Sequence, residues 1–242
     1  MTMEPSILRA RARANLAGKW GISIGIAAVA FLLGGQLTGS NFWPSIGTEA
    51  LARCPTLQTI SNALNWKTGI GPITFSLRSG TLGLATFILG GVIQLGYAQL
   101  LLNQHDGKDF QFRDIFSQFD RFGTGFAQIF LRSVYTTLWS LLLVIPGIVK
   151  SYSYSMTPFI LAEHPNLTAS QAIELSQQMM EGHKMDLFLL NLSFIGWEIL
   201  AGFSFNGIRL NFGYLFLNPY TAAARAAFYR QLQEENRYTS YE

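Results

Sequence analysis

Three long runs without charged residues constrain this chain more than any other feature of its sequence. Residues 20–48 and 79–104 contain no Asp, Glu, Lys or Arg, and residues 187–208 contain only Glu198. A helix exposed to water needs polar residues along its outer face, whereas ~20 mostly apolar residues suffice to cross the ~30 Å hydrocarbon core of a bilayer. The runs therefore predict an all-α fold, a polytopic transmembrane helical bundle.

Composition supports this class and excludes others. Only 13% of the 242 residues are charged and 49% are hydrophobic, whereas a soluble domain carries about 25% charged residues. The net charge is only +3, and no basic patch is interleaved with aromatic residues, so nucleic-acid binding is not expected. The single cysteine, Cys54, has no second cysteine with which to form an internal disulfide.

The sequence predicts about six spans, or five if the short fourth one does not cross. The predicted spans cover residues 20–37, 80–102, 133–149, 151–162, 187–208 and 210–224. With six spans and a cytoplasmic N-terminus, 12 Lys and Arg residues fall inside and 5 outside, against 9 and 8 with five spans. Because basic residues favour the cytoplasmic side, we expect six spans and both termini in the cytoplasm.

We treat residues 1–242 as a single integral membrane domain. It comprises a basic cytoplasmic segment (1–19), a long extracytoplasmic loop (39–79) without clear periodicity, and a cytoplasmic tail (225–242). A cleavable signal peptide is a competing interpretation of residues 1–40. The apolar run is long for a signal peptide, and no small-residue cleavage site follows it.

Three connecting segments have amphipathic helical patterns. Residues 109–122 place Phe112, Ile115, Phe116, Phe119 and Phe122 on one helical face, which favours a helix in the bilayer interface or an elbow packed on the protein itself. Residues 169–180 follow a capping-box sequence at 168–171 and precede a glycine stop at 182. The basic segment 6–19 is predicted to place Ile7, Leu8, Ala10 and Ala14 opposite its arginines.

Basic residues near the expected inner leaflet are candidate lipid contacts. Each one near an anionic surface contributes about 1 kcal/mol of attraction. The candidates are Arg9, Arg11, Arg13, Lys19, His183 and Lys184.

Glu198 is the most informative single residue, because it lies near the middle of a predicted span. A carboxyl group there must be paired, protonated or turned toward an internal cavity. It either responds to protons or cations, or holds helices together. A run rich in hydroxyl groups, residues 150–157, must likewise face protein or water. The candidate polar intramembrane site contains Glu198, Lys150, Tyr152, Tyr154 and Arg209.

Motifs for catalysis and metal binding are missing from the sequence. It contains no G-x-S-x-G and no phosphate-binding glycine loop. The three histidines, His105, His164 and His183, lack the spacing of a metal site. We therefore assign no catalytic residue, no metal and no cofactor. The sequence favours a non-enzymatic protein over an intramembrane enzyme that acts on lipid, for which no base and nucleophile pair is found.

The second half of the chain carries a longer recognisable pattern. It combines residues 145–163, Ala172-Ile173, residues 179–184, residues 192–197, Asn218-Pro219-Tyr220 and Ala227-Phe228-Tyr229. Over about residues 130–230 this pattern resembles the bacterial family of integral membrane proteins catalogued as domain of unknown function number 975. That family is distantly similar to the membrane portion of glycerophosphodiester phosphodiesterase-type proteins. The resemblance implies a bacterial cell-membrane location and no established activity.

Two functional hypotheses follow. In the first, the chain is a non-enzymatic multi-pass bacterial membrane protein that binds membrane lipids or other membrane proteins in envelope maintenance. In the second, it is a small transporter or export factor for a lipid-like or peptide substrate, with a polar cavity around Glu198. Discontinuous helices often form transport sites, and the Pro146-Gly147 pair is a candidate helix break. The oligomeric state does not follow from the sequence.

Overall fold

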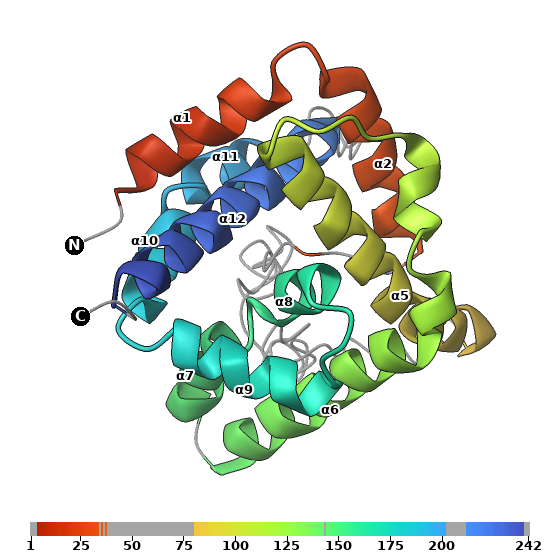
Figure 1. Cartoon of the computed structure of the whole chain (residues 1–242), viewed down its shortest axis with the longest axis vertical. Helices are drawn as coiled ribbons and strands as arrows, with labels where there is room; N and C mark the ends of the chain where they lie inside the picture. The colour runs from red at the N-terminus through yellow and green to blue at the C-terminus, as the bar shows by residue number, and fades with distance from the viewer. Residues whose placement is uncertain are drawn as a thin grey trace, which may run out of the picture.

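The computed structural model describes residues 4–33, 35, 37, 80–142, 144–201 and 212–239. Within these ranges every regular element is a helix, which confirms the predicted all-α class (Figure 1). The predicted loop over residues 39–79 lies outside the described residues. The predicted single-domain organisation is not tested by this structure.

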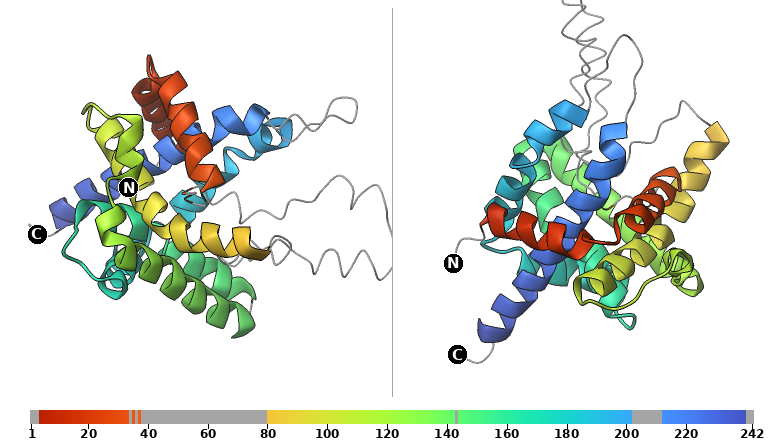
Figure 2. Two further views of the ribbon diagram at one scale, coloured as in Figure 1. Left: turned by 90° about the vertical axis from the view of Figure 1, so that its right-hand side faces the viewer. Right: turned by 90° about the horizontal axis from the view of Figure 1, so that it is seen from above.

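Helices α1 (Pro5–Leu16) and α2 (Trp20–Leu32) are joined by a turn at Gly18, whose φ of 76° suits glycine. Helix α1 lies across the C-terminal helix α12 (Figures 1 and 2). Its buried stripe has a spacing of four residues and consists of Leu8, Ala12 and Leu16. Of the predicted apolar positions, only Leu8 belongs to this stripe, whereas Ile7, Ala10 and Ala14 are exposed.

Helices α5 (Gly80–His105) and α6 (Phe122–Leu142) form a closely packed pair. Gly91 of α5 faces Gly125 of α6, and a Cβ on Gly91 would overlap the Gly125 carbonyl group. Only glycine permits this approach of two backbones. A side-chain hydrogen bond of 2.8 Å from Gln128 Nε2 to Gln94 Oε1 also joins the pair.

The connection between α5 and α6 contains two 3₁₀ helices, η3 (Phe112–Phe116) and η4 (Phe119–Arg121), not the predicted amphipathic α-helix. A capping box lies at the start of η3. In it, the Gln111 backbone N–H donates to Asp114 Oδ2 at 2.7 Å. Ile115 is fully buried against α5, at Gly96. The phenylalanines that were predicted to share its face are exposed instead: Phe112, Phe116, Phe119 and Phe122.

The predicted spans at residues 133–149 and 151–162 fall on the end of α6 and on two short helices, α7 (Val144–Ser153) and α8 (Thr157–Glu163). Residues 133–149 do not form one helix, because Gly147 of α7 packs against Ser140 of α6, an approach that one continuous helix would not allow. Pro146 therefore lies in the first turn of α7, where its missing N–H costs little. Residues 151–162 are divided between α7 and α8, so the predicted fourth span is wrong as a single helix.

Helix α9 (Ala169–Met179) has the predicted start. The Thr168 backbone N–H donates to Gln171 Oε1 at 2.9 Å, and the Gln171 N–H donates to Thr168 Oγ1 at 3.4 Å. Gly182 follows the helix with a φ of 82°. The capping box and the glycine turn are thus confirmed.

Helices α10 (Lys184–Leu192) and α11 (Ile195–Ala201) divide the predicted span over residues 187–208. Ser193 lies between them, and its hydroxyl donates to the Leu190 carbonyl oxygen at 2.6 Å. Helix α12 (Phe212–Thr239) is much longer than the predicted last span. Its residues 222–229 are all buried, so the expected cytoplasmic tail at 225–242 begins inside the core.

Within the described ranges, no helix combines the length and the apolar character needed to cross a membrane. The predicted count of six spans finds no support in these helices. Helix α12 contacts α1, α2, α5 and α11. Four alanines beside Arg225, at positions 223, 224, 226 and 227, allow this close packing.

Candidate polar site in the helical core

A chain of hydrogen bonds joins three helices in the core. Arg225 of α12 donates from Nη2 to Asn191 Oδ1 of α10 at 3.1 Å. Asn191 in turn donates from Nδ2 to Tyr152 Oη of α7 at 3.3 Å. Arg225 is only 8% exposed and also donates from Nη1 to the Leu37 carbonyl oxygen at 2.6 Å. We call Tyr152, Asn191 and Arg225 the Arg225 cluster.

Glu198 of α11 lies close enough for its charge to act on both Arg225 and Tyr152. Its side chain is half-buried and makes a further interaction of its own. The structure thus brings two predicted residues, Glu198 and Tyr152, to one region of the core. The functional part of this prediction is not tested by the geometry.

Two other predicted site residues lie elsewhere. Lys150 donates to Gln177 Oε1 at 3.0 Å, and its Nζ lies 5.1 Å from the centre of the Trp139 ring. Tyr154 packs against Tyr135, with 6.2 Å between the ring centres. The predicted grouping of Lys150 and Tyr154 with Glu198 is therefore not seen. Arg209 lies outside the described residues.

The hydroxyl groups of residues 150–157 are satisfied mainly within their own segment. Ser151 and Ser153 donate to carbonyl oxygens three and four residues earlier in α7, at 2.7 and 3.1 Å. The Ser153 carbonyl oxygen also accepts from Ser176 Oγ of α9 at 2.7 Å, which links the two helices. These hydrogen bonds hold α7 together and join it to α9.

Arg225 and Asn191 were not predicted as site residues, and neither was Arg132 of α6. Arg225 had been counted with the basic cytoplasmic tail. The signal in the sequence is that it interrupts a run of alanines, residues 222–227, that a solvated helix face would not need. Arg132 lies one turn from two buried residues, Gln128 and Thr136, on the inward side of α6.

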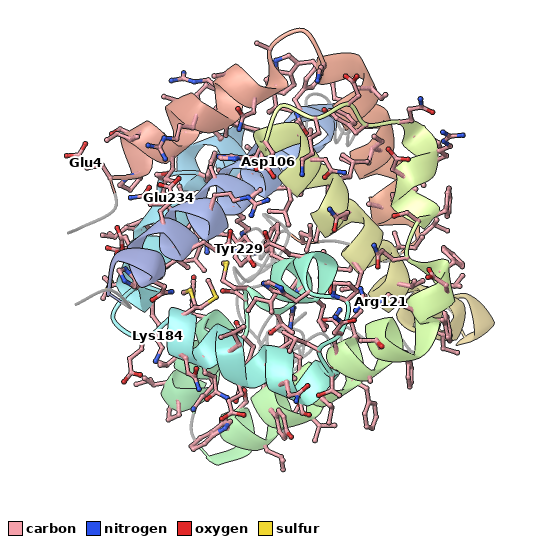
Figure 3. The ribbon with its side chains drawn as sticks, viewed as in Figure 1. Glu4, Asp106, Arg121, Lys184, Tyr229 and Glu234 are labelled. Carbon is pink, nitrogen blue, oxygen red and sulfur yellow. The ribbon has the colours of Figure 1, made fainter. Side chains whose placement is uncertain are left out.

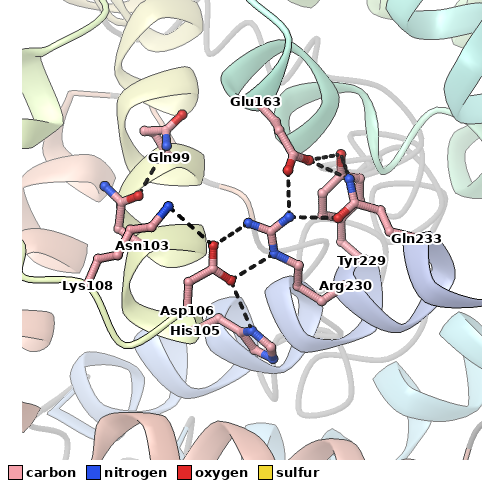
Figure 4. A network of polar contacts seen from close by, with 9 residues as sticks. All are labelled: Gln99, Asn103, His105, Asp106, Lys108, Glu163, Tyr229, Arg230 and Gln233. Carbon is pink, nitrogen blue, oxygen red and sulfur yellow. Dashed lines mark hydrogen bonds and ion pairs between the residues drawn. The ribbon is translucent and has the colours of Figure 1, made fainter.

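A second polar network, centred on Arg230, ties α5, α8 and α12 together (Figure 4). Arg230 donates from Nε to Asp106 Oδ1 at 3.0 Å and from Nη2 to Asp106 Oδ2 at 2.6 Å. Its Nη1 donates to Glu163 Oε1 at 2.6 Å. Glu163 also accepts from Tyr229 Oη at 2.8 Å and from Gln233. We call these residues the Arg230 network.

The charged forms of Glu163 and Arg230 are favoured in the Arg230 network. Burial alone raises the pKa of Glu163, but hydrogen bonds from Arg230 and Tyr229 outweigh it, so the pKa is lowered. Burial likewise opposes the charge of Arg230, yet its two carboxylate partners raise its pKa. Burial lowers the pKa of His105 more than its bond to Asp106 raises it. The network is thus a structural clamp at neutral pH, with a neutral His105 beside it.

The predicted lipid contacts in the N-terminal segment differ in their surroundings. Arg11 and Arg13 are exposed. Arg9 donates to the Ser193 carbonyl oxygen at 3.4 Å, and Lys19 lies 5.1 Å from the centre of the Phe110 ring. Arg11 and Arg13 are therefore the members of this set that are presented to the surroundings.

The two predicted lipid contacts near α10 are half-buried. His183 Nδ1 lies 3.2 Å from Asp186 Oδ2, and its Nε2 lies 3.5 Å from Glu235 Oε2. Lys184 begins α10 at the edge of the view in Figure 3, whereas Tyr229 lies toward its middle. His183 thus has the carboxylates of Asp186 and Glu235 as partners. Lipid binding at these positions stays a prediction.

No group of His, Cys, Asp and Glu side chains in the described part of the chain has the arrangement of a metal site. The described residues form an all-α helical protein with basic and amide side chains in its core. Residues 141–236 match the family model described as Protein of unknown function (DUF975), and this match supports the predicted family over that segment. No curated protein and no solved structure matches the chain. The predicted distant similarity to phosphodiesterase-type proteins stays a prediction.

Proposed function

We propose that this chain is a non-enzymatic lipid-binding protein embedded in the bacterial cytoplasmic membrane, with both termini on the cytoplasmic side. The observation that carries the proposal is the reversed polarity of α6. On its inward side Gln128 and Thr136 are 0% and 2% exposed, whereas Leu138 on the other side is 54% exposed. In water the apolar side of a helix turns inward, so the exposed apolar side of α6 favours an apolar surrounding.

Large apolar side chains are exposed on other helices as well. The most exposed of them are Ile145 of α7 at 74%, Met185 of α10 at 63%, Phe216 of α12 at 58% and Trp197 of α11 at 56%. Exposed apolar side chains are common singly on soluble proteins, and only continued exposure over several elements indicates a contact surface. Acyl chains solvate such a surface at little cost, and the exposed phenylalanines of η3 and η4 suit the headgroup region.

The decisive experiment asks what surrounds Trp197. The chain has five tryptophans, so a variant that keeps only Trp197 and replaces the others with phenylalanine reports on one position. In reconstituted membranes, brominated acyl chains should quench its fluorescence strongly. A variant that keeps only Trp20, which packs against the core, is the matched control and should be quenched less.

The opposite pattern would refute the proposal. If aqueous iodide quenches Trp197 and brominated lipid does not, the exposed apolar surface faces water or protein. Recovery of the full chain in the supernatant after cell lysis without detergent would have the same meaning. Labelling of single cysteines placed in α1 and near the end of α12, in a Cys54→Ser background, tests the proposed cytoplasmic termini.

A second candidate function, a small transporter or export factor for a lipid-like substrate, is favoured by the Arg225 cluster and the nearby Glu198. Polar and charged groups inside a lipid-embedded bundle commonly mark substrate pathways. The test uses fluorescent phosphatidylglycerol in proteoliposomes and follows its movement between leaflets. Loss of movement in Glu198→Gln, with an unchanged thermal midpoint, favours transport. A lowered midpoint without loss of movement favours a structural carboxyl group.

A further inference from the structure

Arg132 is a cation on the inward side of α6 for which the described residues supply no hydrogen-bond acceptor. It lies between Gln128 and Thr136, each four residues away and each buried. Gln128 donates to Gln94, and the Thr136 hydroxyl donates to the Arg132 carbonyl oxygen at 2.8 Å. No described residue accepts from the Arg132 guanidinium group or forms an ion pair with it. Five N–H donors are therefore left for another partner.

The positive charge of Arg225 makes this position less favourable still. The charge of Arg225 acts on Arg132, so two guanidinium groups repel each other within the core. The hydrogen bonds of Arg225 that join it to described residues go to neutral acceptors, the Leu37 carbonyl and Asn191 Oδ1. Glu198 offsets part of the charge of Arg225, and it makes another interaction besides. An anion bound beside Arg132 would compensate the positive charge of its guanidinium group.

The surroundings of Arg132 indicate what kind of anion fits. Arg132, Tyr135 and Trp139 are spaced by three and four residues and so follow one side of α6. Tyr135 and Trp139 are exposed, whereas Arg132 is half-buried. A cation at the inner end of an aromatic strip suits an amphiphile whose anionic head lies inward and whose chains lie along the outer strip. The planar guanidinium group binds phosphate through two parallel hydrogen bonds.

We propose that Arg132 binds the phosphate group of an anionic phospholipid, with Tyr135 and Trp139 in contact with its acyl chains. This inference rests on the proposed function, whose lipid it specifies. The phosphate recognised by Arg132 has two possible sources, a lipid headgroup or free phosphate. The aromatic strip favours the lipid headgroup, and the experiment separates the two.

The test titrates the purified full chain in a neutral detergent with dioctanoyl phosphatidylglycerol, with inorganic phosphate, and with dioctanoylglycerol, which has the same chains and no phosphate. Arg132→Gln should weaken phosphatidylglycerol binding by about tenfold or more, as expected for loss of a charge-assisted bidentate contact. Arg113→Gln removes the same charge from an exposed position of η3 and should change the dissociation constant less than twofold. Arg132→Lys keeps the charge but not the planar guanidinium group, so its dissociation constant should lie between those of the other two variants.

A stability measurement separates binding from a structural role. Without lipid, Arg132→Gln should leave the thermal midpoint unchanged or raise it, because an unpaired and partly buried charge is removed. Added phosphatidylglycerol should then raise the midpoint of the parent chain more than that of the variant. If Arg132→Gln lowers the lipid-free midpoint by several degrees, the guanidinium group supports the fold and the inference is wrong.

The remaining outcomes are equally decisive. Binding of inorganic phosphate as tight as that of the lipid, and lost in Arg132→Gln, confirms the phosphate site and makes free phosphate its ligand. Equal affinity for dioctanoylglycerol and phosphatidylglycerol overturns the inference, because the phosphate is then not recognised. Unchanged lipid affinity in Arg132→Gln overturns it too. In that case quenching of Trp197 by brominated lipid still decides the proposed membrane location, so the two failures are distinguishable.

Discussion

Replacing Arg230 with glutamine is expected to destabilise the protein strongly, because this side chain holds three helices together. The change removes two hydrogen bonds to Asp106 and one to Glu163, at 3.0, 2.6 and 2.6 Å. The side chains of Arg230, Asp106 and Glu163 are 17%, 24% and 26% exposed, so solvent screens the lost interactions only in part. Two carboxylates are left without their shared cation.

The magnitude follows from the partners that remain. Breaking a fully buried ion pair from one side costs about 3–5 kcal/mol. Asp106 keeps contacts with Lys108 and His105, and Glu163 keeps those with Tyr229 and Gln233 (Figure 4). We therefore expect about 3 kcal/mol, at the lower end of that range, or a midpoint lowered by about 6–12 °C in a chain of this size.

The assay is thermal unfolding of the purified chain in neutral detergent, followed by circular dichroism. Lys108→Gln is the matched control, because it removes one positive charge from the same Asp106. Lys108 lies 3.7 Å from Asp106 and is 66% exposed, so its loss should hardly move the midpoint. A shift for Arg230→Gln no larger than that for Lys108→Gln would refute the reasoning. If the reasoning holds, the double variant Arg230→Gln, Asp106→Asn should be destabilised by less than the sum of the two single variants, because both single changes remove the same hydrogen bonds.

Three further outcomes test other parts of the structure. The stabilisation from Glu163 should be lost on acidification: its folded pKa lies below the ordinary 4.5, so the stabilisation is complete above that value and disappears as pH falls through the folded pKa; the midpoint difference between parent and Glu163→Gln should stay constant from about pH 7 to about pH 5 and shrink at lower pH. Gly91→Ala should destabilise by about 1–3 kcal/mol or more through overlap with the facing backbone, whereas Gly123→Ala, which meets open space, should be neutral or stabilising in the same thermal assay. A tryptophan at Phe116 in a background without other tryptophans should be quenched by lipids brominated close to the headgroup, and one at Ser117 should be quenched less.

Local signals in the sequence predicted local structure well. The start of α9 was predictable because Thr168 and Gln171 satisfy each other's backbone N–H groups within four residues. The glycine turn at Gly182 was predictable because a φ of 82° suits glycine and few other residues. Such features depend on nearest neighbours in the chain, and tertiary contacts do not alter them.

Helix ends within long apolar runs were not predictable in the same way. Hydropathy alone does not separate α6 from α7. Pro146 was therefore expected to break a helix, whereas it lies in the first turn of α7. Likewise, periodicity on an α-helix placed Ile115 with the phenylalanines. The 3₁₀ turns bury Ile115 against α5 and leave the phenylalanines outside.

The candidate site depends on contacts between distant segments, which explains why only part of it was predicted. Glu198 and Tyr152 attract attention as polar groups in apolar runs. Arg225 contacts Leu37 and Asn191, which are 188 and 34 residues away in the sequence. The alanines around it, residues 222–227, indicate a packed helix, but they do not identify Leu37 and Asn191 as its partners.

The reversed polarity of α6 connects the proposed surroundings of the protein with its proposed ligand. If acyl chains solvate Leu138 and its neighbours, polar groups on the inward side of α6 must be satisfied inside the bundle, because lipid offers no hydrogen bonds. Gln128, Ser133 and Thr136 each donate such a bond, at 2.8 Å in every case. Among these inward polar residues only Arg132 donates none to a described residue. A fold that satisfies the neutral donors and leaves the charged one available has the polarity of a site for an anion. The same arginine in water would need no partner, so quenching at Trp197 and lipid binding at Arg132 test linked consequences of one arrangement.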